Sequence, residues 1–275
     1  MKEKKEKSVK KTDAAEKKSS AKGKAPAFPS SPRGEFLSRL HAAGISDRVV
    51  DAFSHVDQAL FFDPLFRDKL WGEGDIPIGH GARSDNFLSL AKMIDYLNPG
   101  DNDRVLEIGT GSGYSTAVIS LLCREVVSVE INENLARRAK KHLYDNNFGN
   151  IRFFVGDGTV PDESYGSIDG VIIHAACRKR PLSVLAIVKA RGRVVYAMGP
   201  AHSQQIAILE NRDNVEKDTP FKTTLCEQGN FSLIEGAYGY NVDLVSLEDL
   251  MSDGEAEPPK SMVAKDFLFE PKMDE

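Results

Sequence analysis

The residue run best suited to ligand binding in this sequence is VLEIGTGSGY, in which an apolar segment reaches the acid Glu107 and passes into alternating glycines. The loop that follows the acid contains Gly109, Thr110, Gly111 and Gly113. Such a loop lets a ligand approach the backbone at the carboxyl end of a strand. A dinucleotide fingerprint, G-x-G-x-x-G, would need glycine or alanine where this sequence has Tyr114. We therefore predict a different small ligand here, the alternative being a purely structural turn.

Two further acids follow later apolar runs. Glu130 ends the run VVSVE, 17 residues after Gly113, and a carboxylate there can accept hydrogen bonds from both hydroxyls of a ribose. Ile131 comes next and is assigned to the same site. Asp157 could accept from the amino group of an adenine, while Gly158 leaves room for the ring. The two acids together predict a ligand that contains a nucleoside.

A third candidate is the polar loop PIGHGARSDNFLSLAKM, which runs into a helix with an apolar face. Its charged triplet, Arg83, Ser84 and Asp85, lies where the loop should turn, so it is either part of a reaction centre or a solvated corner. His174 follows a later apolar run, and we interpret it as a satisfied histidine at the end of a strand. The three cysteines lie far apart and lack C-x-x-C spacing, so we expect neither a metal site nor a disulfide framework.

The elements that must position these residues alternate along the chain. The runs RVLEI, EVVSVE, IRFFVG, IDGVIIHA and GRVVYAMG predict strands, and YSTAVISLL, NENLARRAKKHLYDN and RPLSVLAIVKA predict helices between them. Helical patterning also covers about residues 34–53, and QQIAILE and FSLIEGAYGY predict later antiparallel strands. This alternation indicates an α/β fold with a central, mostly parallel sheet that helices flank on both faces.

Charge is distributed unevenly along the 275 residues. Residues 1–34 hold 11 Lys or Arg and 4 Asp or Glu, a net charge of +7, which leaves 25 basic and 37 acidic residues, a net of −12, in the rest. A body this acidic argues against a nucleic-acid-binding core. The basic start has no apolar run that could serve as a signal peptide, and no stretch approaches a membrane span. With its reduced cysteines, the chain is expected in the cytoplasm.

We predict three parts, which are a disordered basic tail at 1–33, a globular domain at 34–247 and an acidic tail at 248–275. Within the domain we expect a helical and loop cap at 34–100, a ligand-binding core at 101–210 and C-terminal strands at 211–247.

The series VLEIGTGSGY, VVSVEI, VGDG, IDGVIIHAA and VKARGRVVYAMGP resembles the protein-L-isoaspartate O-methyltransferases, as does the upstream stretch from GISDRVVDAFSHVD through GDIPIGHG. The resemblance covers about residues 36–247. It implies a Rossmann-like fold with N- and C-terminal additions, and S-adenosyl-L-methionine (SAM) as the cofactor. Glu107 would then interact, directly or through water, with the cationic methionine end of SAM. The implied activity is methyl-esterification of isoaspartyl carboxylates in damaged proteins, so a protein or peptide carrying such residues is the implied partner.

The charged triplet departs from the pattern of this family. In the family the glycine of GHG precedes a pattern like Q-T-I-S, whose serine is regarded as the catalytic position. In this sequence Ala82 takes the place of the glutamine, and Arg83, Ser84 and Asp85 take those of threonine, isoleucine and serine. The C-terminal R-F-V-P-L pattern of the family appears as DLVSL, with Asp243 where arginine is usual.

Several roles for the triplet follow from these departures. A carboxylate acceptor is already ionised near neutral pH and needs no general base, so Asp85 facing it would repel it. Arg83 could offset this repulsion by pairing with Asp85 or by gripping the substrate carboxylate, and a slip of one residue would give the hydroxyl role to Ser84. Alternatively, Asp85 is the general base for a neutral nitrogen or oxygen acceptor. In a third reading the chain is a non-catalytic SAM-binding interaction module.

Overall fold

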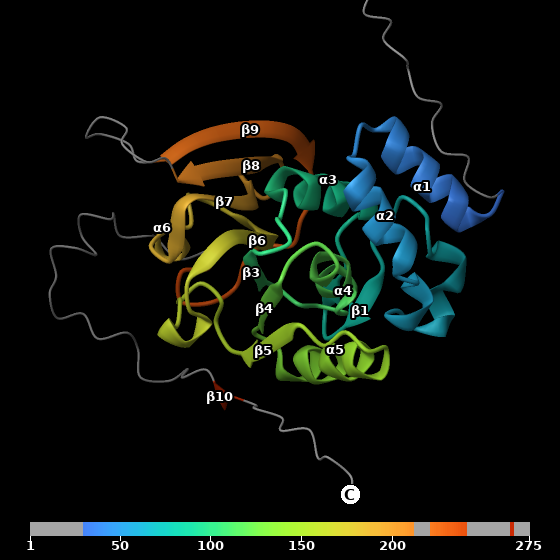
Figure 1. The fold of residues 1–275 in the computed structure, drawn as a ribbon, viewed down its shortest axis with the longest axis horizontal. Helices are drawn as coiled ribbons and strands as arrows, with labels where there is room; N and C mark the ends of the chain where they lie inside the picture. The colour runs from blue at the N-terminus through green and yellow to red at the C-terminus, as the bar shows by residue number, and fades with distance from the viewer. Residues whose placement is uncertain (1–29, 212–220, 241–264, 267–275) are drawn as a thin grey trace, which may run out of the picture.

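The strands of the main sheet lie in the order β10-β5-β4-β3-β6-β7-β8-β9 in this computed structural model (Figure 1). Their bounds are β3 (Arg104–Ile108), β4 (Glu125–Glu130), β5 (Ile151–Val155), β6 (Ile168–Cys177), β7 (Val188–Met198), β8 (Gln204–Asn211), β9 (Phe221–Gly229) and β10 (Lys265–Asp266). Strands β5, β4, β3, β6 and β7 run parallel, while β8, β9 and β10 are antiparallel to their neighbours. The structure describes residues 30–211, 221–240 and 265–266, so most of both predicted tails lies outside the described residues.

The central strands are buried on both faces, which is why their sequences are almost continuously apolar. Alternate side chains enter two apolar layers. The first layer contains the side chains of Val105, Val126, Ile172 and Val195, and the second those of Leu106, Val127, Ile173 and Tyr196. Residues of α1 to α5 complete the first layer, and residues of the short helices η3 and α6 enter the second. The predicted mostly parallel sheet with flanking helices is confirmed, with the longer helices gathered on one face.

The bounds of the helices are α1 (Pro32–Ala42), α2 (Asp47–His55), α3 (Phe87–Leu97), α4 (Tyr114–Ser120), α5 (Glu133–Asp145) and α6 (Leu182–Leu185), with the 3-10 helices η1 (Gln58–Leu60), η2 (Pro64–Lys69) and η3 (Glu163–Tyr165). Asparagine caps begin the two helices that flank the candidate site. The side chain of Asn86 accepts from the first backbone N–H groups of α3, and that of Asn132 does so for α5. These caps fix where both helices leave the site.

The N-terminal helical region differs from the prediction in two ways. Its first helix begins at Pro32, because the side chain of Ser31 caps it by accepting from the N–H of Gly34. The helix therefore includes the last two residues of the stretch predicted as a tail, 32 and 33. The predicted stretch 34–53 is also two helices, α1 and α2, because the chain turns at Gly44 with a positive φ of 81°.

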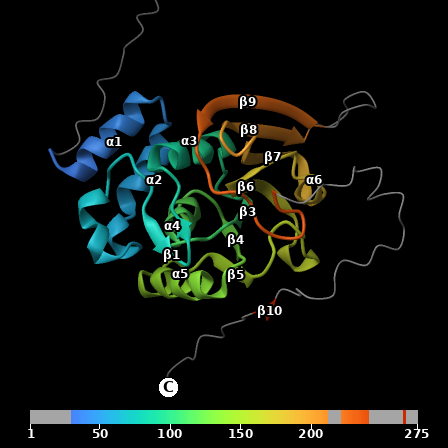
Figure 2. The ribbon, with the colours of Figure 1, turned by 180° about the vertical axis from the view of Figure 1, so that it is seen from behind.

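Two predictions in the C-terminal half are corrected as well. The run RPLSVLAIVKA is helical only at α6, and its end belongs to β7. The strand after β8 is β9, whereas the run FSLIEGAYGY, residues 231–240, contributes only an isolated bridge between Leu233 and Ala176. Gly236 turns this run with a φ of 117°, and the N–H groups of Ala237 and Tyr238 then donate to the side chains of Asp157 and Thr159 after β5. Figure 2 shows the segment passing beside β6 rather than extending the sheet.

Tyr114 anchors the glycine loop to the N-terminal helices. Its ring lies 5.5 to 6.0 Å, centroid to centroid, from the rings of Phe53, Phe61, Phe62 and Phe87, within the range of favourable aromatic pairs. The bulky residue that departs from the dinucleotide fingerprint thus packs α2 and α3 against the start of α4. This packing brings the turn before α3 close to the glycine loop.

Within the described residues, every helix is too short or too polar to cross the hydrocarbon core of a membrane.

Candidate active site

A hollow lies at the carboxyl ends of β3 and β4, between the glycine loop and the turn before α3. Its lining comes mainly from residues 82–85, 109–112 and 114–115, together with the side chains of Glu130 and His174. Parallel sheets bind ligands at this end of their strands. The structure therefore brings the predicted loop, one predicted acid and the charged triplet to the same hollow.

The glycine loop has a backbone that a larger residue would strain. Gly109 and Gly111 have φ angles of 97° and 56°, a region that favours glycine. The N–H of Gly109 donates to the carbonyl of Val129 at 2.8 Å, which ties the loop to the end of β4. A Cβ atom on Gly111 would lie 3.1 Å from the side chain of Ile78 across the hollow. Gly109, Thr110 and Gly111 therefore line the hollow, whereas Gly113 lies against Ala139 and Leu143 of α5. A cofactor role for these four residues stays a prediction.

Glu130 holds the glycine loop and the start of the next helix. Its Oε2 atom accepts from the N–H of Gly111 at 2.9 Å, and its Oε1 atom accepts from the N–H of Asn132 at 3.0 Å. The side chain is largely buried, and burial raises the pKa of its carboxyl, although both N–H donors oppose that shift. Each oxygen keeps a further lone pair for a ligand hydroxyl.

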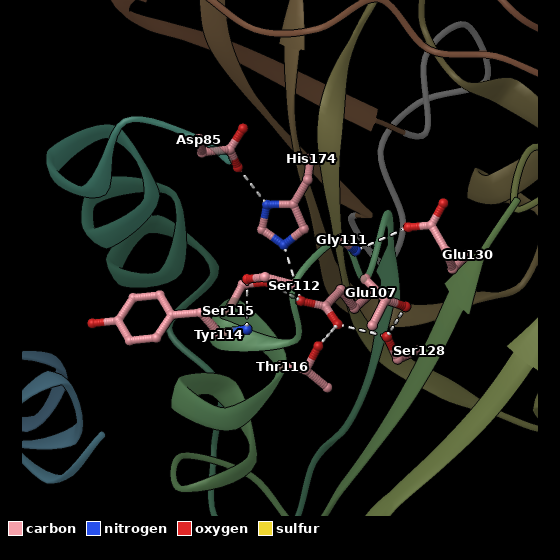
Figure 3. A network of polar contacts seen from close by, with 11 residues as sticks. Asp85, Glu107, Gly111, Ser112, Tyr114, Ser115, Thr116, Ser128, Glu130 and His174 are labelled. Atoms are coloured by element: carbon pink, nitrogen blue, oxygen red, sulfur yellow. Dashed lines mark hydrogen bonds and ion pairs between the residues drawn. The ribbon is translucent and has the colours of Figure 1, made fainter. Parts of the chain in front are cut away.

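Glu107 is fully buried, and its carboxylate accepts hydrogen bonds from the surrounding side chains (Figure 3). The donors are Ser115 at 2.6 Å, Thr116 at 2.5 Å, Ser128 at 2.7 Å and, with its ring at 3.1 Å, His174. Of these groups, Ser115 and His174 also line the hollow. Glu107 therefore orients two side chains that face the ligand space.

Asp85 and His174 form a buried ion pair where the turn before α3 meets the hollow. The Oδ2 atom of Asp85 lies 2.7 Å from Nδ1 of His174, and their side chains are only 10% and 7% exposed. Burial alone would lower the pKa of His174, but Asp85 and Glu107 raise it to about 10. The imidazole is therefore protonated at neutral pH, with one carboxylate at each nitrogen (Figure 3).

The other two members of the triplet have different partners. The guanidinium of Arg83 is held by the carboxylate of Asp75 at the exposed rim, so Arg83 does not pair with Asp85. The hydroxyl of Ser84 accepts from the N–H of Ile76 at 2.9 Å and donates to the carbonyl of Asp85 at 3.1 Å. All three residues line the hollow, but only the carboxylate of Asp85 joins its charged centre.

Asp157 and its neighbours lie apart from the lining of the hollow. Its Oδ1 atom accepts from the backbone and hydroxyl of Thr159 at 2.8 and 2.6 Å, and its Oδ2 atom accepts from the N–H of Ala237 at 2.5 Å. A Cβ on Gly158 would lie 2.5 Å from Ile108, so the backbone approaches the end of β3 closely there. Ile131 is 37% exposed beyond Glu130. In this structure Asp157 thus anchors the segment after Gly236, and Asp243 lies outside the described residues.

Sequence reasoning assigned no site role to His174, Ser115 and Ser128. The ring of His174 meets partners 89 and 67 residues away in the chain. One signal could have located it, since His174 lies in β6 directly after Ile173, which pairs with Ile108 at the end of β3 and so beside Glu107.

The residues of the hollow fit SAM. A cofactor with a sulfonium and an ammonium group suits a site whose buried charged groups, in or directly behind the lining, are three carboxylates, Asp85, Glu107 and Glu130, and one imidazolium, His174, while the guanidinium of Arg83 stays at the exposed rim. The exposed backbone of the glycine loop leaves space for close approach, and Glu130 ends β4 where a ribose would be bound. Among the described residues there is no cluster of side chains able to hold a metal ion.

Comparison with known proteins gives a consistent result. The family model for protein-L-isoaspartate(D-aspartate) O-methyltransferase matches residues 32–225. A protein-L-isoaspartate O-methyltransferase of Myxococcus xanthus is 38% identical over 174 residues, which are 63% of this chain and 81% of that protein. One from Rhodopseudomonas palustris is 37% identical over 181 residues, which are 65% of this chain and 83% of that protein.

Solved structures show the same fold. A structure described as protein-L-isoaspartate O-methyltransferase superposes with a TM-score of 0.65 at 21% identity, covering 75% of this chain and 66% of that chain. A Plasmodium falciparum protein assigned to the same enzymes, in complex with S-adenosyl-L-homocysteine, superposes with a TM-score of 0.62 at 15% identity, covering 73% and 97%. The chain therefore belongs to the protein-L-isoaspartate(D-aspartate) O-methyltransferase family and is a SAM-dependent methyltransferase.

Proposed function

We propose that this enzyme transfers the methyl group of SAM to the free carboxylate of isoaspartyl residues in proteins or peptides. Membership of the family supports the substrate class, because the relatives it matches are named protein-L-isoaspartate O-methyltransferases. The observation that carries the proposal in this chain is the single hollow shared by the glycine loop, Glu130 and the turn at residues 82–85. Cofactor groups and acceptor groups face the same space.

The chemistry requires little of the protein beyond orientation. An oxygen of the ionised acceptor carboxylate attacks the sulfonium methyl carbon, the new O–C bond forms as the C–S bond breaks, and S-adenosyl-L-homocysteine leaves as a neutral thioether. No proton is transferred, so no general base is needed. Rate enhancement then depends on holding the two reactants in line in a site that excludes water.

Each lining element has a role in this reaction. The glycine loop and Glu130 bind the cofactor, and Glu107 orients Ser115 and His174 beside it. The turn at residues 83–85 forms the acceptor side of the hollow. At the rim, the exposed guanidinium of Arg83 can leave Asp75 for an incoming carboxylate, because both partners remain solvated. The triplet therefore receives a substrate-facing role. The three free cysteines among the described residues fit the reducing cytoplasm as the location of the enzyme.

The test compares three peptides of one sequence with methyl-labelled SAM. The first contains an isoaspartyl residue, the second a normal aspartyl residue, and the third an isoaspartyl residue whose free carboxylate is an amide. We expect label to enter the first peptide at least about a hundredfold faster than the others, since the carboxylate nucleophile must be both present and correctly placed. Equal labelling of all three would contradict the assigned acceptor.

A further inference from the structure

The chain Asp85–His174–Glu107 links the acceptor side of the hollow to the core of the cofactor site. The side chains of all three residues are nearly or fully buried, with exposed fractions of 10%, 7% and 0%. They come from the turn before α3, from β6 and from β3. Figure 3 shows the ring of His174 directed at Asp85 through one nitrogen and at Glu107 through the other.

This geometry fixes the net charge of the three linked side chains Asp85, His174 and Glu107. Each ring nitrogen lies within hydrogen-bond distance of a carboxylate oxygen, at 2.7 and 3.1 Å. An ionised carboxylate only accepts, so both nitrogens must carry protons, which only the imidazolium does. The two carboxylates and the one imidazolium together carry a net charge of −1 rather than −2.

The position of Asp85 makes this charge important for substrate binding. Asp85 lines the hollow on its acceptor side, where a carboxylate would disfavour an incoming carboxylate. Arg83 is not paired with Asp85, because its exposed guanidinium lies at the rim, where it contacts Asp75 and can meet an incoming carboxylate. His174 is the cation that contacts Asp85 inside the hollow.

We infer that His174 is a positioning residue that neutralises Asp85 and holds it away from the acceptor, so that this site admits a carboxylate substrate. The inference rests on the proposed function, and it assigns to His174 the charge compensation that the sequence left to Arg83. It also explains why an aspartate is compatible with this place in the turn. Without the imidazolium, the acceptor side would present an unpaired buried carboxylate.

Calorimetry on protein saturated with S-adenosyl-L-homocysteine tests this inference without turnover. His174→Gln should weaken binding of the isoaspartyl peptide at least about tenfold, since a neighbouring charge shifts such equilibria by one to three powers of ten. Binding of the amidated peptide, which lacks the carboxylate, should change less than about threefold, within the usual effect of a neutral substitution. The double variant Asp85→Asn/His174→Gln should recover the affinity of the parent for the isoaspartyl peptide to within about threefold.

A surface pair provides the matched control. His55 and Asp51 form a histidine–aspartate pair on α2, with side chains 64% and 73% exposed. His55→Gln and Asp51→Asn/His55→Gln should bind both peptides as the parent does. In turnover assays His174→Gln should raise KM for the isoaspartyl peptide more than it lowers kcat, because the repulsion acts on substrate entry.

Two results would overturn the inference. One is that His174→Gln weakens binding of the isoaspartyl and amidated peptides equally. The other is that the double variant binds the isoaspartyl peptide no more tightly than His174→Gln. Either result would make the role of His174 purely structural. Should His174→Gln fail to fold, NMR of labelled histidine in the parent and in Asp85→Asn decides the matter. The imidazole of the parent must stay protonated through neutral pH and titrate lower in Asp85→Asn. A parent protein that binds the isoaspartyl peptide but forms no ester would contradict the proposed function and leave these binding results interpretable.

Discussion

Replacing Glu130 by glutamine tests how the cofactor site is assembled, because the change keeps the size of the side chain and removes one acceptor. Both carboxylate oxygens of Glu130 accept backbone N–H groups, from Gly111 at 2.9 Å and from Asn132 at 3.0 Å. In Glu130→Gln only one of these bonds can persist, and the amide NH2 group faces a donor in place of the other. The variant should therefore loosen the loop as well as weaken ribose binding.

The magnitude follows from the lost bonds. A hydrogen bond to a charged group contributes about 1.5–3 kcal/mol, and each 1.4 kcal/mol changes an affinity about tenfold. We expect the dissociation constant for SAM to rise about 10- to 100-fold, and the free energy of unfolding to fall by about 1–3 kcal/mol because a partly buried N–H loses its acceptor. Glu133→Gln is the control, since that side chain lies on the exposed surface of α5 with 59% exposure.

The assay is calorimetric titration with SAM, with chemical denaturation for stability. It also has a pH signature. Burial raises the pKa of Glu130 above its ordinary value of 4.5, so the affinity of the parent for SAM should fall as the pH drops through that raised pKa. Glu130→Gln should lack this decrease. A folded variant whose SAM affinity stays within about twofold of the parent, below the contribution of even a neutral hydrogen bond, would refute this account of Glu130.

Three other predictions concern packing, the rim and pH. Gly158→Ala places a Cβ 2.5 Å from Ile108 and should lower the free energy of unfolding by about 1–3 kcal/mol. Gly149→Ala, with open space around the new Cβ, should be nearly neutral. Similar denaturation midpoints for these two variants would contradict the close approach at Gly158. Arg83→Ala should raise KM for the isoaspartyl peptide several-fold, as expected for a solvated charge contact, while SAM affinity and melting temperature stay unchanged; an unaltered KM would remove Arg83 from the site. Burial lowers the pKa of His174, but Asp85 and Glu107 raise it to about 10, so the stability conferred by these ion pairs is complete below about pH 6.5 and is lost as the pH rises through about 10. The melting-temperature difference between the parent and His174→Gln should shrink over that range, and a constant difference would show that the ring does not titrate with its partners.

Much of the fold and part of the site were predictable because they depend on local patterns. The apolar runs located the strands, and the run NENLARRAKKHLYDN located α5. The positions of Glu107 and Glu130 at strand ends placed both acids near the glycine loop. In the structure the loop, Glu130 and the charged triplet line one hollow.

What was missed depends on contacts between distant parts of the chain. The pairing of Asp85 with His174 joins residues 89 positions apart and follows from the order of β3 and β6 in the sheet. The N–H of Ala237 donates to the carboxylate of Asp157, 80 positions earlier in the chain. This contact belongs to a turning segment at residues 231–240, where the apolar pattern had predicted a strand. No local period encodes either contact.

The most direct test of the proposed reaction is the chemical nature of the transferred methyl group. The enzyme is incubated with methyl-labelled SAM and an isoaspartyl peptide. The labelled peptide should then release all of its label as volatile methanol in mild base, because methyl esters hydrolyse in mild base and N-methyl and ether linkages do not. Incubation with Glu130→Gln at a SAM concentration near the dissociation constant of the parent should give about 5- to 50-fold less of the same labile product, because occupancy falls by that factor when the dissociation constant rises about 10- to 100-fold. Label that remains on the peptide after base treatment would show transfer to a neutral nitrogen or oxygen and would contradict methyl-ester formation.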